Sequence, residues 1–289
     1  MYIHLYIKLY IRGSAKLKNK LMIPKKIHFC WLSGDEYPPL IKYCIETWKK
    51  VLPDYEIVLW DTNRFDINSV AWVKEAYESK KYAFAADYIR LYAVYTEGGI
   101  YLDSDVEMLK PFDDLLSSLS FIGFEAATEN IEAAIFGAEQ GCAWCKKAME
   151  FYESNHFEVN SQGRVDADII APNIIHNALK EVFVDFPETP VTNTTSTGKG
   201  DLTVCPTTFF SPIEYDIEKS YKSGKDVAKR YRENPDTYCI HRFNAAWGLK
   251  PSKKLQLWDC FKGRCRKLFG ERIANGIINS IRFVARLIR

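Results

Sequence analysis

The sequence predicts an α/β fold, with a mainly parallel sheet flanked by helices on both faces. From residue 22 onward, short apolar runs alternate with longer amphipathic stretches of helical length, which is typical of strands joined through helices. Acidic residues follow several of these runs directly, where the carboxyl ends of parallel strands form ligand sites. The 289 residues, 47% hydrophobic and 26% charged, suit one large domain and exclude wholesale disorder.

Each element has a local signal. Two prolines, Pro38 and Pro39, favour the start of a helix, because proline suits the first helical turn. Gly98 and Gly99 end another helix, since glycine accepts a positive φ at a helix end. The Thr-, Gly- and Ser-rich segment 193–200 is predicted to be a mobile loop. Strands are expected at 27–32, 55–60, 100–102, 121–124, 131–136 and 238–243, and helices at 38–50, 70–79, 82–96, 142–154 and 167–179.

Charge divides the chain into three parts. Residues 1–26 carry seven lysines and arginines and no acid, residues 250–289 carry a net charge of +9, and the whole chain is at +2, so residues 27–249 are at −14. We expect an N-terminal extension over 1–21, with Met22 as the native start, a catalytic domain over 22–249, and a basic tail over 250–289. An acidic body disfavours nucleic acid as a partner, whereas basic ends suit an anionic membrane surface.

The tail has the pattern of an amphipathic basic helix. Its apolar residues recur at helical spacing and its arginines fall on another face. We expect it to bring the protein to the inner face of the plasma membrane, although a helix packed on the body or a homodimer contact would produce the same pattern. The apolar positions are Ile273, Ile277, Ile281, Val284 and Ile288, and the arginines are Arg282, Arg286 and Arg289.

The eight cysteines are expected to be free thiols in a reducing, cytoplasmic setting. No secretory signal is convincing, and no run reaches the roughly 18–20 apolar residues that span a bilayer. Cys142 and Cys145 have CxxC spacing, but a single CxxC is weak support for zinc or redox chemistry. We interpret them as ordinary helix thiols.

The most informative stretch is residues 98–107, GGIYLDSDVE. Asp103 and Asp105 lie two residues apart at the end of an apolar strand, so both carboxylates can point to one side. Such a pair offers hard oxygen ligands to Mg²⁺ or Mn²⁺. A cation held there would neutralise a nucleotide diphosphate and stabilise it as a leaving group.

Other interpretations of the acidic pair have less support. The bare tripeptide occurs by chance in solvated turns. A phosphatase nucleophile motif would have Thr or Val two residues beyond the second aspartate, where this chain has Glu107. An EF-hand loop would need a further Asp or Asn and then a glycine.

Taken together with its surroundings, this stretch resembles the DXD sugar-binding region of family 32 glycosyltransferases. These are relatives of yeast mannosyltransferases and of bacterial capsular polysaccharide and lipopolysaccharide transferases. The resemblance spans about residues 22–248. The segments that carry it are 23–31 (IPKKIHFCW), 55–61 (YEIVLWD), 85–92 (AADYIRLY), 98–107, 122–125 (IGFE) and 238–247 (YCIHRFNAAW).

The resemblance implies a GT-A-like, Rossmann-type nucleotide-sugar-binding fold and a divalent metal, Mn²⁺ or Mg²⁺. It also implies transfer of a hexose from a UDP- or GDP-sugar to a glycan or lipid-linked saccharide, usually with retention of anomeric configuration. We expect a role in bacterial surface polysaccharide synthesis. A nucleotide-sugar hydrolase, an inactive sugar-binding relative and a metal-dependent carbohydrate-binding module are the alternatives.

The matched positions imply roles for the acidic pair and the helix before it. Asp103, Asp105 and Arg90 are the expected catalytic residues. Asp105 would hold the metal, while Asp103 would contact the metal, ribose or sugar. Asp87 and Arg90 match the family's Asp-x-x-Arg and would bind donor sugar hydroxyls. Three residues apart on a helix, they could instead simply pair with each other.

Further matches complete the expected donor site. Trp31 would stack on the nucleotide base, unless it is a core residue capping the sheet. His241 would be a third metal ligand or a diphosphate donor, unless it is structural. Trp247 would close over the donor, and Asn173 would reach a sugar. The sequence departs from the family at Ala246, where a serine hydroxyl is expected.

Overall fold

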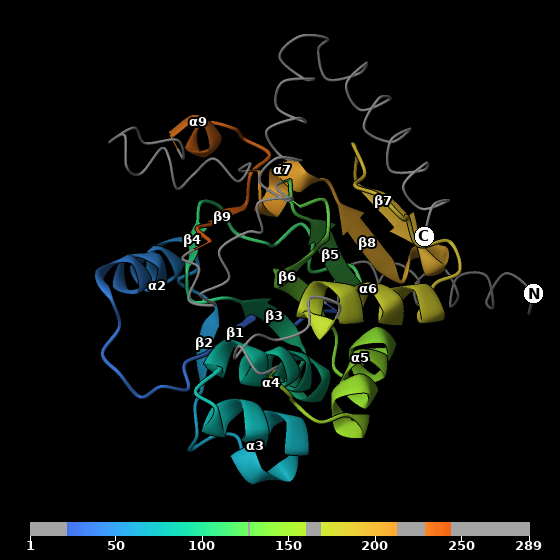
Figure 1. Ribbon diagram of the computed structural model, residues 1–289. Coiled ribbons are helices and arrows are strands. Elements are labelled where there is room, and N and C mark those ends of the chain that lie inside the picture. The colour runs from blue at the N-terminus through green and yellow to red at the C-terminus, as the bar shows by residue number, and fades with distance from the viewer. Residues whose placement is uncertain (1–21, 127, 160–168, 213–228, 244–289) are drawn as a thin grey trace, which may run out of the picture. The chain divides into compact units, whose positions relative to one another are not determined.

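A seven-stranded mixed sheet forms the centre of the protein in a computed structural model (Figure 1), which describes residues 22–126, 128–159, 169–212 and 229–243. The predicted extension over 1–21, the tail over 250–289, Ala246 and Trp247 lie outside these residues. The sheet order is β2-β1-β3-β6-β5-β8-β7. The strands are β1 (Lys26–Cys30), β2 (Glu56–Trp60), β3 (Gly99–Leu102), β5 (Ser120–Phe124), β6 (Ile131–Ala138), β7 (Thr195–Thr197) and β8 (Leu202–Cys205).

Most strands of this sheet run in one direction. β1 pairs in parallel with β2 and β3, and β5 pairs in parallel with β8. β6 is antiparallel to both of its neighbours, β3 and β5, and β7 is antiparallel to β8. The carboxyl ends of β1, β2 and β3 therefore meet at one edge, where Trp31, Asp61 and Asp103 follow them.

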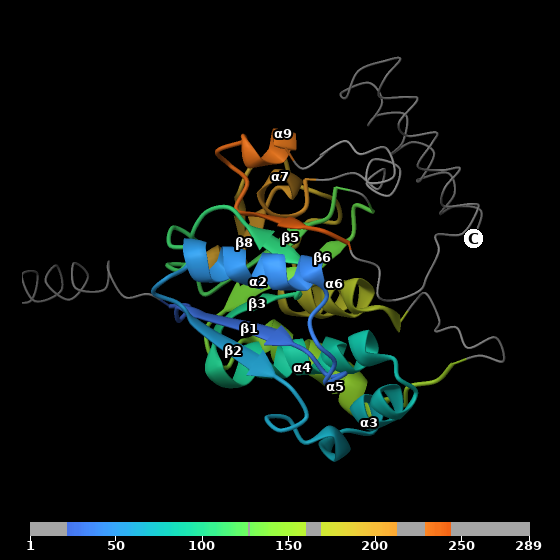
Figure 2. The same cartoon turned by 90° about the vertical axis from the view of Figure 1, so that its left-hand side faces the viewer.

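Helices cover both faces of the sheet. Figure 2 shows α2 (Pro39–Val51) on one side and α3 (Ala71–Glu78), α4 (Tyr82–Glu97) and α5 (Ala143–Ser154) on the other. The remaining helical segments are α6 (Ala171–Val182), α7 (Thr207–Phe210), α9 (Lys229–Arg232) and the 3₁₀ turns η1 (Ile67–Ser69) and η3 (Gly198–Gly200). The predicted α/β fold, with a mainly parallel sheet flanked by helices, is confirmed.

A second, two-stranded ribbon pairs distant parts of the chain. β4 (Val106–Met108) runs antiparallel to β9 (Cys239–His241), with Val106 opposite His241. Helix α2 packs on this ribbon through two hydrogen bonds. Trp48 Nε1 donates to the Val106 carbonyl at 2.6 Å, and Thr47 Oγ1 accepts from the Met108 amide at 2.9 Å.

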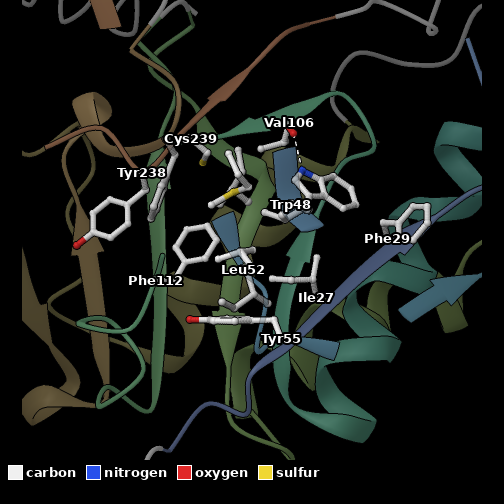
Figure 3. Packing of buried hydrophobic residues seen from close by; sticks show 14 of the residues in the cluster. Ile27, Phe29, Trp48, Leu52, Tyr55, Val106, Phe112, Tyr238 and Cys239 are labelled. Carbon is white, nitrogen blue, oxygen red and sulfur yellow. Dashed lines mark hydrogen bonds between the residues drawn. The ribbon is translucent and has the colours of Figure 1, made fainter. Parts of the chain in front are cut away.

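The core lies between α2, this ribbon and the sheet (Figure 3). Ile27 and Phe29 alternate along β1 toward α2, where Trp48 is fully buried and meets Phe29 edge-on at 5.4 Å between ring centroids. Phe112 stacks on Tyr238 at 5.7 Å, which fixes β9 from the other side. Aromatic pairs of this kind add about 0.5–1.5 kcal/mol beyond their buried area.

Two predictions about loops and short strands were wrong or incomplete. Segment 193–200 was predicted to be a loop but contains β7, which pairs with the unpredicted β8. Strand β4 was not predicted either. These strands have three or four residues, too few for an alternating pattern. Strands β4 and β8 pair with β9 and β5, which lie far away in the sequence, whereas β7 pairs with β8 next to it in the chain.

Six of the eight cysteines lie among the described residues, and these six are free thiols. The reducing, cytoplasmic setting stays a prediction. Cys142 and Cys145 are buried free thiols at the start of α5. Among the described residues, no helix combines the length and the apolar character that a bilayer span requires.

The turn before β3 depends on two glycines. Gly98 caps α4 with φ of +65°, and its amide donates to the Val94 carbonyl at 2.8 Å, as predicted for a helix end. Gly99 follows with φ of +115°. His28 locks the turn, since its Nε2 donates to the Gly98 carbonyl at 2.8 Å while its Nδ1 accepts from Trp60 Nε1 at 3.0 Å.

Gly99→Ala is expected to destabilise the protein more than Gly141→Ala. Both residues have positive φ, which costs an L-residue roughly 1–2 kcal/mol. A Cβ at Gly99 would also lie 2.9 Å from the Lys26 carbonyl oxygen and 3.0 Å from His28 Nε2, whereas a Cβ at Gly141 meets nothing within 4 Å. Thermal unfolding by circular dichroism measures the difference, and equal losses would contradict this account of the turn.

Candidate functional site

The acidic pair lies in a tight turn at the end of β3. The Asp103 amide donates to the Ala134 carbonyl at 2.9 Å, continuing the ladder with β6, and the Val106 amide donates to the Asp103 carbonyl at 3.1 Å. This closes a β-turn over residues 103–106. Both carboxylates remain partly accessible, with 20% of the Asp103 side chain and 13% of the Asp105 side chain exposed.

Strand β9 brings His241 to this turn. His241 Nε2 lies 3.6 Å from Asp105 Oδ1, and one ligand atom from each of Asp103, Asp105 and His241 lies within 4.8 Å of the others. Two carboxylates and an imidazole are ligands that Mn²⁺ or Mg²⁺ accepts. The structure therefore brings together the three residues predicted to hold a metal, and their donor set fits one.

The site has a strongly negative electrostatic character. Burial alone would lower the pKa of His241, but the carboxylates of Glu132, Asp105 and Asp103 outweigh it and raise the pKa to about 10. Such a potential attracts a cation. The same field would also bind a nucleotide diphosphate poorly unless a cation accompanied it.

Arg90 connects helix α4 to the acidic turn. Its guanidinium nitrogen Nη2 lies 2.9 Å from Asp87 Oδ1 and 3.4 Å from Asp103 Oδ1, and Nη1 donates to the Ala133 carbonyl at 2.9 Å. The Tyr101 hydroxyl donates to the same Asp103 oxygen at 2.8 Å. Asp103 is thereby held in place from two elements.

Asp87 and Arg90 are almost completely buried, at 0% and 2% exposure. They pair with each other, which is the structural alternative named for them above, and this state leaves no surface of either for a sugar hydroxyl. Burial raises the pKa of Asp87 to about 7, while Arg90 opposes the shift and Asp103 adds to it. Their role in donor binding stays a prediction.

Trp31 and Asn173 lie on other elements than the acidic turn. Trp31 follows β1, where its Nε1 donates to the Asp35 carbonyl at 2.7 Å and its ring meets Tyr37 edge-on. Asn173 lies in the first turn of α6, a helix that packs on β6. Base stacking by Trp31 and sugar contact by Asn173 stay predictions.

The sequence analysis did not single out Glu132 and gave no role to Glu125, although Glu125 lies in the segment 122–125 that carries the resemblance. Glu132 is fully buried in β6, with Oε1 3.3 Å from His241 Nδ1, and Glu125 is 8% exposed. Burial and the neighbouring Glu132 raise the pKa of Glu125 to about 8. The signal for Glu132 was present, since it is the one charged residue in the apolar run IEAAIFGA of β6, and a charge is seldom buried without partners.

Glu107 anchors the strand that follows the turn. It is 1% exposed and accepts from Arg232 Nε at 2.6 Å, Arg242 Nη1 at 2.8 Å and the Tyr43 hydroxyl at 2.8 Å. These contacts join β4 to α2, α9 and the end of β9. They hold β9, which carries His241, against β4, which directly follows Asp105.

Comparison with known proteins places this geometry in a family context. Residues 38–122 match the glycosyltransferase sugar-binding region containing the DXD motif. The resemblance to family 32 glycosyltransferases is confirmed over this region, which includes Asp87, Arg90, Asp103 and Asp105.

Two curated relatives match over part of the chain. Inositol phosphoceramide mannosyltransferase 3 of Schizosaccharomyces pombe is 36% identical over 101 residues, which is 32% of this chain and 27% of the relative. Glucan organizing enzyme 1 of Cryptococcus neoformans is 45% identical over 56 residues, or 19% of this chain and 15% of the relative. The chain thus spans about a quarter or less of the length of these relatives.

Among solved structures, the PaToxG glycosyltransferase aligns with 61% of this chain and 75% of its own, at 21% identity and a TM-score of 0.42.

Asp87→Asn is expected to change how stability depends on pH. The Asp87 pKa is about 7 in the folded chain and near 3.8 in the unfolded chain, so its stabilising contribution is complete below the unfolded value and is lost as pH rises through 7. Asparagine does not ionise. The melting temperature of the variant relative to wild type should therefore rise between about pH 5 and pH 8, reflecting at most about 1.4 kcal/mol per pH unit.

A melting-temperature difference for Asp87→Asn that stays constant with pH would contradict the burial argument.

Proposed function

We propose that this chain, which carries the DXD sugar-binding region of glycosyltransferases over residues 38–122, is a divalent-metal-dependent glycosyltransferase. It would transfer a hexose from a UDP- or GDP-sugar to a glycan or lipid-linked saccharide. The observation that carries the proposal is the meeting of Asp103, Asp105 and His241 at the carboxyl edge of the sheet. In α/β folds this edge is where ligands bind.

In this proposal Asp105 and His241 hold the cation, with Asp103 as the third ligand or as a contact to the ribose or sugar. The bound cation would supply charge neutralisation for the departing diphosphate. The fixed position of Asp103, held by Arg90 and Tyr101, means that little reorganisation is needed when the donor binds. Such preorganisation is a main source of catalytic stabilisation.

Asp105→Asn is expected to lower the transfer rate by about 100-fold or more, the scale of losing one preorganised electrostatic group. The assay measures nucleoside diphosphate release from UDP- and GDP-hexoses with Mn²⁺ and a saccharide acceptor. The control variant is Asp54→Asn. Asp54 precedes β2 at the opposite edge of the sheet, so this variant should retain wild-type activity. Equal rates for the two variants would refute a role for Asp105.

The same assay separates the alternative functions. Donor cleavage that ignores the acceptor would indicate a nucleotide-sugar hydrolase. Donor binding without any cleavage, detected by a shift in melting temperature, would indicate an inactive sugar-binding relative.

We further propose that the reaction retains the anomeric configuration. The acceptor hydroxyl would attack the anomeric carbon on the side from which the diphosphate leaves. The new C–O bond would form as the bond to the diphosphate breaks, and the acceptor's proton would pass to a diphosphate oxygen. The protein then contributes positioning and charge stabilisation rather than a covalent nucleophile.

The anomeric outcome is measured directly by a proton NMR time course with an α-linked donor of gluco or galacto configuration. The first product formed should show the small anomeric coupling constant of an α-linkage. A large coupling constant, typical of a β-linkage, would exclude retention.

The cellular setting is also a proposal. A role in bacterial surface polysaccharide synthesis, at the cytoplasmic face of the membrane, fits the +9 net charge of residues 250–289. Basic segments of this kind gain about 1 kcal/mol for each Lys or Arg near an anionic surface.

A further inference from the structure

Behind the acidic turn lies a buried carboxylate with a specific set of donors. Glu132 stands in β6, fully buried between β3 and β5. Its Oε1 accepts from the Ala134 amide at 3.0 Å, and its Oε2 accepts from the Ser211 hydroxyl. A carboxylate in an apolar strand is costly unless donors surround it, so this position is built to hold one.

The third partner of Glu132 is His241. Its Nδ1 lies 3.3 Å from Glu132 Oε1, while its Nε2, on the opposite side of the ring, lies 3.6 Å from Asp105 Oδ1. Phe243 packs on the imidazole with ring centroids 4.0 Å apart. The ring is therefore fixed in an orientation that directs Nε2 toward the acidic turn.

This is the arrangement in which a carboxylate orients a metal-binding histidine. A carboxylate that accepts the Nδ1 proton leaves the Nε2 lone pair for the metal and raises its basicity. We propose that Glu132 is the positioning residue for His241, selecting Nε2 as the atom that ligates the cation. The inference rests on the proposed function, since it assumes that Asp103, Asp105 and His241 bind a divalent ion.

The same buried residues could also bind an ion directly. Ligand atoms of Glu125, Glu132 and His241 also lie within 4.8 Å of one another, so this trio could hold an ion of its own. The oxygens of Glu132 are already engaged by Ala134 and Ser211, however, and Glu125 Oε2 accepts from the Thr128 hydroxyl at 2.6 Å. These bonds favour a positioning role over direct ligation.

Manganese binding to Glu132→Gln and Glu125→Gln tests the inference. Both variants replace a buried carboxylate by an amide of the same shape. Glu132 lies beside His241 Nδ1, whereas Glu125 accepts a hydrogen bond from Thr128. Electron paramagnetic resonance titration with MnCl₂ in the presence of UDP measures the Kd. We expect Glu132→Gln to weaken Mn²⁺ binding about 10–100-fold, which is the scale of losing a contact that orients a metal ligand. Glu125→Gln removes no such contact, so it should change the Kd for Mn²⁺ less than about threefold.

The outcomes separate the hypotheses. Equal affinity of Glu132→Gln and wild type would overturn the inference alone, and so would equal weakening in both variants, which would indicate direct ligation by the buried trio. Failure of wild type to bind Mn²⁺ would overturn the proposed function and the inference with it.

A second measurement needs no variant at the glutamates. Long-range ¹H–¹⁵N correlation spectra of the wild-type protein report which ring nitrogen carries a proton, with the His241 signals assigned by their loss in His241→Gln. We expect a protonated Nδ1 both without and with Mg²⁺ and UDP. A neutral imidazole that carries its only proton on Nε2 would contradict the inference.

Discussion

The antiparallel pairing of β4 with β9 is the interaction on which the candidate site depends. Val106 faces His241 across this ribbon, and the pairing joins segments that are more than 130 residues apart in the chain. Because side chains alternate along a strand, a shift of one residue would turn His241 away from the acidic turn. The register is held by the hydrogen bond from Trp48 to the Val106 carbonyl and by the ion pair between Glu107 and Arg242. Helix α2 therefore helps to position the residues proposed to bind the metal.

Charged side chains of both signs surround Asp103 and Asp105, and they are buried more deeply than the two aspartates. Arg90 and Asp87 lie beneath the turn and pair with each other, while Glu132 lies behind His241. Removing one partner of a buried ion pair costs roughly 3–5 kcal/mol. The pairing therefore holds each of these charged side chains in a fixed orientation. The carboxylates of Asp103 and Asp105 stay partly exposed at the edge where the donor is proposed to bind.

Much of this arrangement was predictable from the sequence, and the remainder has physical reasons for escaping it. The strand leading to Asp103 and the glycine stop at Gly98 have strong local signals, and both were confirmed. Strands β4, β7 and β8 have three or four residues, too few for an alternating pattern, and β4 and β8 pair with strands far away in the sequence. Glu132 could be noticed as a charge in an apolar strand, but nothing local assigns its partner, since His241 reaches it only through the fold. Whether Asp87 and Arg90 bind sugar or only support Asp103 also depends on burial that the motif does not encode.

Asp105 and His241 are proposed to bind one metal ion at the carboxyl edge of the sheet, with Asp103 as the third ligand or as a contact to the donor. The most direct measurement is an anomalous difference map from crystals of the full chain grown with MnCl₂ and UDP. The account predicts a manganese peak bonded to Asp105 and to Nε2 of His241, with diphosphate oxygens completing its coordination. A peak within the Glu125, Glu132 and His241 trio, or UDP bound at this edge with no manganese beside it, would contradict the account.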